Sequence, residues 1–317
     1  MARAFVFPGQ GSQSIGMGRD LAAASAIARA VFDEVDEALG QKLSTLMFEG
    51  DPAELTLTEN AQPALMAVSL AVMREVEARS GLTIVELVDC VAGHSLGEYS
   101  ALAAAGAFSI WDCARLLKVR GQAMQAAVPV GAGAMAALMG VSVEEANAIA
   151  RDAAEGLVCA AANDNAPGQV VVSGHREAVE AAVALAAERG ARRSVLLPVS
   201  APFHCDLMAP AAEAMRTALD EVELRAPAVP LVANVTAEPV MDPDIIRDLL
   251  VAQVTGAVRW RESIGYMRSV GITEVVELGA GRVLSGLARR IDRDMTGLSL
   301  GSIEDIDAFV ARVTAGA

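Results

Sequence analysis

The segment that decides the fold is Val91-Ala92-Gly93-His94-Ser95-Leu96-Gly97-Glu98-Tyr99-Ser100-Ala101-Leu102. The apolar, β-branched residues from Ile84 to Val91 predict a buried strand before it. The Ala- and Leu-rich residues from Leu96 to Ala105 predict a helix after it. A strand that turns directly into a helix needs a sharp bend, and the glycines on both sides of Ser95 remove side chains that would clash there. The prediction is therefore a nucleophile elbow, with the Ser95 hydroxyl at a helix N-terminus.

A Gly-x-Ser-x-Gly string alone also occurs in ordinary turns of a chain rich in glycine and alanine. The strand and helix predicted around this one favour the functional interpretation. The remaining support must come from other parts of the chain.

Length and composition restrict the class of protein. The chain has 317 residues, enough for one large domain or a large domain with a smaller insert. Its net charge of −15 argues against a nucleic-acid partner, and an anionic ligand would need a local Arg or Lys. The uncharged run 121–143 is interrupted by Pro and Gly, so we expect no membrane span. The N-terminus leads directly into a predicted strand, and we expect no secretion signal.

The cysteines indicate a reducing compartment. Cys90, Cys113, Cys159 and Cys205 are scattered and form no CxxC pair, which favours free thiols and a cytoplasmic location. Cysteine and histidine show no metal-ligand spacing. We therefore expect no metal and no cofactor.

A single charge lies on the apolar face of a second predicted helix, which begins at Ser109 as its N-cap. Arg120 shares that face with apolar residues such as Cys113, Leu117 and Met124. A buried guanidinium without a partner is very costly. Arg120 therefore pairs with an internal Asp or Glu, which is the commoner outcome, or with a carboxylate of the substrate. The nearby elbow favours the substrate.

The middle of the chain predicts a small inserted domain. Strands are expected over 134–140, 157–162, 169–173 and 193–199, helices over 143–154 and 176–189, and a turn over 163–168. This order is βαββαβ, the ferredoxin-like unit. We predict an inserted domain 131–198 within a larger α/β domain formed by 1–130 and 199–317, with hinges near Gly131, Gly133 and Pro198.

One histidine is the best candidate for a general base. His94 is adjacent to the serine, so its ring should point away, and His175 is expected to cap a helix in the insert. His204 lies in a loop after a strand end, where catalytic residues of α/β proteins collect. The alternative is a hydrogen-bonded structural histidine.

Two glycine turns are weaker signals. Pro8 to Gln13 follows the first predicted strand and would let backbone approach a ligand. Gly279-Ala280-Gly281-Arg282 could hold a phosphate at a helix start, but it lacks the full dinucleotide fingerprint and favours tight packing.

Taken together, the motifs resemble the acyltransferase family that includes malonyl-CoA:acyl carrier protein transacylases and the acyltransferase domains of polyketide synthases. The resemblance extends from Phe5 to the C-terminal helix. It is carried by Phe7 to Gln13, Gly93 to Leu102, Arg120-Gly121, Gly133 to Met135, Pro167 to Val171, Pro202 to His204, and Gln253 with Val258 to Trp260. The implied fold is an α/β-hydrolase-like large domain with a parallel sheet and a ferredoxin-like insert.

The resemblance implies roles for five residues of the reaction centre. Ser95 would be the nucleophile and His204 its general base. The backbone carbonyl of Gln253 would orient His204, where many hydrolases use an aspartate. The backbone N–H groups of Leu96 and Gln10 would form the oxyanion hole.

The resemblance also implies the substrate and partner. Arg120 would bind the free carboxylate of malonyl-CoA, and Phe203 agrees with malonyl rather than methylmalonyl. Acyl carrier protein would receive the malonyl group, and we expect a monomer. The carrier, its docking surface and the choice between fatty acid and polyketide synthesis stay open. Basic candidates for that surface are Arg189, Arg192, Arg193, Arg289 and Arg290, although each is also consistent with a solvated face.

Two rival functions remain. A serine hydrolase of this fold usually places an acid between serine and histidine in the chain, and we identify no clear one. A non-catalytic module that binds the carrier protein would not need Ser95, Arg120 and His204 together.

Overall fold

A six-stranded sheet carries the segment around Ser95. In the computed structural model, which describes residues 2–315, its strands follow the order β10-β9-β1-β2-β7-β8. They are β1 (Arg3–Phe7), β2 (Cys90–Gly93), β7 (Leu231–Val232), β8 (Pro239–Val240), β9 (Glu274–Leu278) and β10 (Thr296–Leu300). Neighbours pair in parallel, except that β8 is antiparallel to β7. The carboxyl ends of β1 and β2 therefore meet at one edge.

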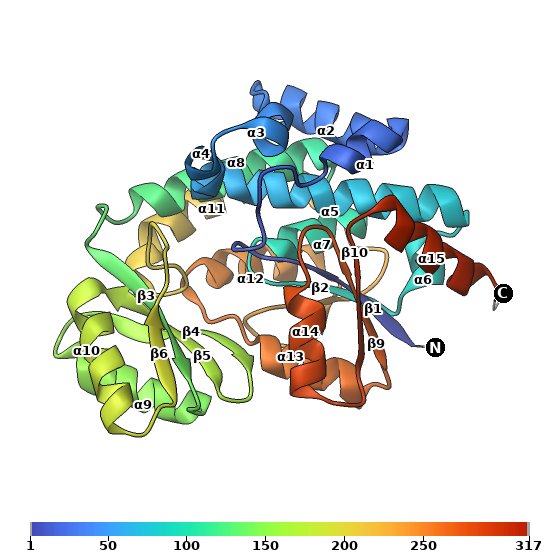
Figure 1. Ribbon diagram of the computed structural model, residues 1–317. Coiled ribbons are helices and arrows are strands. Elements are labelled where there is room, and N and C mark those ends of the chain that lie inside the picture. The colour runs from blue at the N-terminus through green and yellow to red at the C-terminus, as the bar shows by residue number, and fades with distance from the viewer. Residues whose placement is uncertain (1, 316–317) are drawn as a thin grey trace.

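Helices cover both faces of this sheet (Figure 1). Along β1, Phe5 and Phe7 pack into the core that includes α5 (Thr58–Ser80) and α7 (Gly97–Ala104). Ala4 and Val6 pack into a separate core with α13 (Trp260–Ser269) and α14 (Val283–Ile291). This alternation follows from the two-residue period of a strand and explains why the strands are apolar on both faces.

The large unit has ten further helices among its described residues. They are α1 (Arg19–Ala24), α2 (Ala26–Leu39), α3 (Leu43–Glu49), α4 (Pro52–Thr56), α6 (Ile84–Leu87), α8 (Ile110–Ala126), η1 (Asp206–Met208), α11 (Ala209–Asp220), α12 (Pro243–Thr255) and α15 (Ile303–Thr314). The Ser109 hydroxyl accepts a hydrogen bond from the Asp112 N–H at 2.9 Å, which confirms the predicted N-cap. Within residues 2–315, no helix has the length and apolar composition that crossing a membrane requires.

A second, antiparallel sheet is built from the middle of the chain. Its elements are β3 (Gly133–Met139), α9 (Val143–Ala154), β4 (Cys159–Ala166), β5 (Gln169–His175), α10 (Arg176–Glu188) and β6 (Arg193–Leu196). The predicted order of strands and helices is confirmed, and the sheet order is β4-β5-β3-β6. The unit has its own apolar core between the sheet and its two helices (Figure 1).

Two local predictions were wrong. Ile84 to Val91 is not one strand: α6 comes first, and β2 begins only at Cys90. Thr83 and Glu86 form a capping box, which stabilises the helical turn against the β-branched composition.

The predicted turn 163–168 is mostly strand, because β4 continues to Ala166 and only Pro167-Gly168 turns. Asn163 forms a parallel bridge with Val258 of the large unit, and the Asp164 N–H donates to the Val258 carbonyl at 2.9 Å. Tertiary pairing thus holds polar residues in an extended conformation. The last predicted strand, 193–199, is shorter than expected because β6 ends at Leu196.

Candidate active site

The turn between β2 and α7 has no room for side chains at either glycine. A Cβ on Gly93 would lie 1.9 Å from the backbone of Gly97, and a Cβ on Gly97 would lie 2.1 Å from the Phe7 carbonyl oxygen. Ser95 has a φ of 55°, a left-handed conformation that is strained for a residue with a side chain. The predicted elbow geometry is therefore present.

Ser95 and His204 form a hydrogen-bonded pair. Ser95 Oγ lies 2.8 Å from His204 Nε2, and His204 Nδ1 lies 2.9 Å from the Gln253 carbonyl and 3.1 Å from the Gly256 carbonyl. Because carbonyl oxygens only accept, Nδ1 carries the proton and Nε2 offers its lone pair to the serine hydroxyl. Burial, with Arg120 nearby, lowers the pKa of His204 to about 3. The imidazole is therefore neutral and able to accept a proton.

The other two histidines lie outside this pair. His94 Nε2 lies 2.8 Å from Asn165 Oδ1 of β4, and its ring lies beside Trp260. His175 precedes α10, but its side chain does not cap the helix as predicted. Its Nδ1 accepts from the Val158 N–H at 2.9 Å, because β5 brings it beside the start of β4.

Neutral groups surround the guanidinium of Arg120, which is 1% exposed. It donates to Gln62 Oε1 at 2.7 Å, to Gln253 Oε1 at 2.8 Å and to Ser95 Oγ at 3.2 Å. No carboxylate of the described chain lies within ion-pair distance of it, and its Nε has no acceptor there. The direct internal ion pair weighed from the sequence is therefore not formed.

A directional hydrogen-bond chain leads from Arg120 to the loop after β1. Arginine only donates, so Gln62 must accept the hydrogen bond from Arg120 through Oε1. The Gln62 Nε2 then donates to Thr58 Oγ1 at 2.8 Å. The Thr58 hydroxyl then donates to Gln10 Oε1 at 2.9 Å. Sequence reasoning missed Thr58 and Gln62, because a helix period shows a buried face but not which polar groups meet across it.

Thr58→Val is expected to lower the free energy of unfolding by about 1–3 kcal/mol, because the isosteric side chain removes both the hydroxyl that accepts from the buried Gln62 and the donor to Gln10 Oε1. Denaturant titration measures the change. Thr56→Val is the matched control, because Thr56 is exposed, and it should stay within about 0.5 kcal/mol of the parent. Equal losses of unfolding free energy in the two variants would contradict the hydrogen-bond chain from Arg120 to Gln10.

Asn234 is a third residue that the sequence reasoning missed. Its Oδ1 accepts from the Ser95 N–H at 2.8 Å, and its Nδ2 donates to the Gly93 carbonyl at 2.6 Å. It follows β7, whose carboxyl end lies beside that of β2. A polar residue two positions after the end of a buried parallel strand was the available signal.

The Ser95–His204 pair and Arg120 line one cavity of about 470 Å³. Its lining includes Gln10, Ser95, Leu96, Arg120, Phe203 and His204. In the part of the chain that the structure describes, the N–H groups of Leu96 and Gln10 take part in no hydrogen bond within the protein. Two donors therefore remain available beside a hydroxyl, a base and a buried cation.

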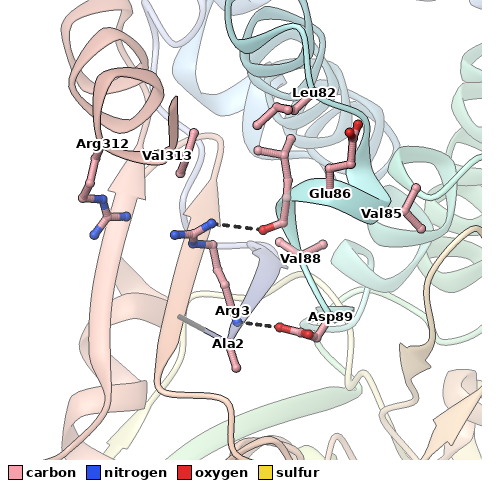
Figure 2. A pocket seen from close by; sticks show the side chains of 10 residues that line it. Ala2, Arg3, Leu82, Val85, Glu86, Val88, Asp89, Arg312 and Val313 are labelled. Carbon is pink, nitrogen blue, oxygen red and sulfur yellow. Dashed lines mark hydrogen bonds between the residues drawn. The ribbon is translucent and has the colours of Figure 1, made fainter. Parts of the chain in front are cut away.

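A larger cavity of about 780 Å³ lies at the opposite edge of the sheet, where β1 and β2 begin (Figure 2). Its charged groups already have partners. The Arg3 side chain donates to the Leu87 carbonyl, the Arg3 N–H donates to Asp89, and Arg3 and Arg312 both pair with Glu274. None of the described residues that line this cavity is a nucleophile paired with a base, so the smaller cavity is the candidate site.

The Gly279 turn packs closely, as its composition favoured. A Cβ on Gly279 would lie 2.4 Å from Ser69 Oγ, and that hydroxyl donates to the Leu278 carbonyl at 2.8 Å. The glycine is needed for contact between α5 and the end of β9.

Comparisons with known proteins show the family of this chain. The acyl transferase domain family matches residues 4–290. A malonyl CoA-acyl carrier protein transacylase of Bacillus subtilis is 45% identical over 97% of this chain and 96% of its own length. The acyl-carrier-protein-S-malonyltransferase structure from Bartonella henselae is 56% identical, with a TM-score of 0.96 and 99% of each chain covered.

A structure described as a type II PKS acyl-carrier protein in complex with its malonyl-transacylase is also similar. It is 38% identical, has a TM-score of 0.95 and covers 98% of this chain and 100% of that one. The mixed α/β architecture, with one largely parallel and one antiparallel sheet, is thus shared with acyl transferases. This chain belongs to the acyl transferase family, among the malonyl CoA-acyl carrier protein transacylases.

Proposed function

We propose that this enzyme transfers the malonyl group of malonyl-CoA to the phosphopantetheine thiol of an acyl carrier protein, for fatty acid or polyketide synthesis. The observation that carries the proposal is the buried guanidinium of Arg120, 3.2 Å from Ser95 Oγ and without a direct carboxylate partner among the described residues. A substrate with a free carboxylate on its acyl group fits beside this pair.

In the first half-reaction, Ser95 Oγ attacks the thioester carbonyl while His204 Nε2 takes the hydroxyl proton. The N–H groups of Leu96 and Gln10 stabilise the tetrahedral oxyanion, each contributing roughly a few kcal/mol. The C–S bond then breaks, His204 returns its proton to the leaving thiolate, and CoA departs. The product is a malonyl ester on Ser95.

In the second half-reaction, the carrier thiol loses its proton to His204 and attacks the ester. The Ser95 oxygen leaves and recovers the proton from His204. The Gln253 carbonyl keeps the imidazole in the required tautomer throughout, because it accepts from Nδ1–H. No group is oxidised or reduced in either step.

The arrangement of domains forms part of the proposal. We infer an α/β-hydrolase-like domain from 1–130 and 199–317, and a ferredoxin-like insert from 131–198, whose strand order β4-β5-β3-β6 supports it. We also infer a monomer in the cytoplasm. A complete site within one chain and four unpaired cysteines support these inferences.

Intact-mass spectrometry tests the function. Malonyl-CoA alone should give a stable malonyl adduct on Ser95, and adding holo acyl carrier protein should discharge it onto the carrier thiol. Rapid release of malonate without carrier would instead indicate a hydrolase. Folded protein that forms no adduct would indicate a binding module.

A further inference from the structure

Glu98 is a buried acid for which the reaction described above has no use. It is fully buried in the first turn of α7, three residues after Ser95. Its Oε2 accepts from the Asn234 N–H at 3.0 Å and from Gln253 Nε2 at 2.9 Å. Its Oε1 has no hydrogen-bond partner among the described residues. An unpaired buried carboxylate oxygen is costly, so its surroundings must compensate for it.

The Gln253 carboxamide joins this acid to Arg120. Its Nε2 donates to Glu98, and its Oε1 accepts from the guanidinium at 2.8 Å. The amide dipole is therefore aligned between a negative and a positive group, which makes the arrangement an amide-bridged ion pair. Because Glu98 balances the charge through an intervening amide, the guanidinium can still donate toward Ser95.

We propose that Glu98 is the buried counter-charge of Arg120 in the free enzyme, and that it takes up a proton from solvent when the malonyl carboxylate binds. The inference rests on the proposed function. Without substrate, the site holds one cation and one anion. A bound malonyl carboxylate adds a second anion in a low-dielectric site, and protonating Glu98 restores the balance. The proton would bind Oε1, because Oε2 already accepts two hydrogen bonds.

The other titratable groups around Glu98 hold their charge state near neutral pH. Burial raises the pKa of Tyr99 on the same helix and of Cys113 on α8, so both stay protonated. Burial lowers the pKa values of His204 and His94, so both stay neutral. For Glu98 itself, burial raises the pKa to about 7 and the hydrogen bonds and Arg120 oppose the rise. Glu98 is thus the group able to change charge.

The sign of the pH dependence follows from this placement. A bound carboxylate raises the pKa of Glu98 further, so malonyl-CoA binds best where Glu98 is already protonated in the free enzyme, below about pH 7. Above that pH each complex must acquire a proton. The Kd then rises by up to about tenfold per pH unit.

Calorimetry on Ser95→Ala tests this, because that variant binds malonyl-CoA without acylation. Titrations in buffers of different ionisation enthalpy count protons, and acetyl-CoA corrects for protons taken up by the CoA portion. Near pH 8 we expect uptake approaching one proton for malonyl-CoA in excess of acetyl-CoA. Ser95→Ala combined with Glu98→Gln should abolish the uptake and flatten the pH dependence of Kd. Ser95→Ala combined with Glu144→Gln, a change at an exposed position, should leave both the proton uptake and the pH dependence of Kd as they are in Ser95→Ala.

Each outcome is decisive. No excess uptake in Ser95→Ala overturns the proposal, whether or not the Glu98→Gln variant folds, and so does uptake that survives Glu98→Gln. The proposed function is judged separately, by the malonyl adduct on unmodified enzyme. An adduct that forms without proton linkage would therefore reject only the role of Glu98.

Discussion

Ser95→Ala is expected to abolish the malonyl-enzyme adduct and to lower carrier malonylation by at least about 10⁴-fold, because no other nucleophile lies against His204 Nε2 in the described structure. His204→Ala should cause a loss of similar size, since a neutral serine hydroxyl is a weak nucleophile without a base. Radiolabel transfer from malonyl-CoA to carrier measures the rate, and intact mass detects the adduct.

The double variant distinguishes a catalytic pair from two independent contributors. Ser95 and His204 act as one unit, so removing both should cost little more than removing either alone. His175→Ala is the matched control, because its ring binds the Val158 N–H away from the site and its activity should stay near that of the parent. If the rate losses of the two single variants multiply in the double variant, Ser95 and His204 do not act as one catalytic unit.

Arg120→Ala is expected to lower kcat/KM for malonyl-CoA by about 10⁴-fold and to narrow or reverse the preference over acetyl-CoA. The planar guanidinium matches a carboxylate with two parallel hydrogen bonds. Acetyl-CoA leaves the same buried cation without a new partner, so the parent enzyme should discriminate against it. Competition between the two thioesters, read as acyl-carrier products by mass, measures the ratio.

Two companion variants define the origin of that effect. Arg120→Lys keeps the charge but loses the fork, so its malonyl activity should fall between those of the parent and Arg120→Ala. Arg115→Ala removes an exposed arginine of the same helix and should leave both activities unchanged. Unchanged malonyl kinetics in Arg120→Ala would refute the assigned role.

Local chemistry made several parts of the structure predictable. Glycines on both sides of Ser95 were recognised because a strand-to-helix reversal excludes side chains, and the close backbone distances there have the same cause. The helix 143–154 was predicted with the bounds of α9, and the structure shows a Ser142 N-cap and acidic first-turn residues that stabilise its start. Arg120 was identified because a lone charge on an apolar face is physically unusual.

Polar contacts across the fold were not predictable in this way. Asn234, Gln62 and Thr58 each contact a site residue far away in the chain. Such partners depend on which strand ends and helix faces meet, and a period of two or 3.6 residues does not encode that. The strand at Asn163 was missed for the same reason, because its pairing with Val258 overrides the turn preference of its own residues.

By itself, the sequence determined the elbow, the order of elements in the middle of the chain and the residue types of a serine–histidine–arginine centre, since these follow from sterics and burial within short segments. Only the tertiary structure decided how Arg120 is balanced: by neutral amides, with Glu98 placed behind the Gln253 carboxamide. The reason is that electrostatic compensation depends on distances across the packed core. These distances are set when α7, α8 and α12 meet at the carboxyl edge of the parallel sheet.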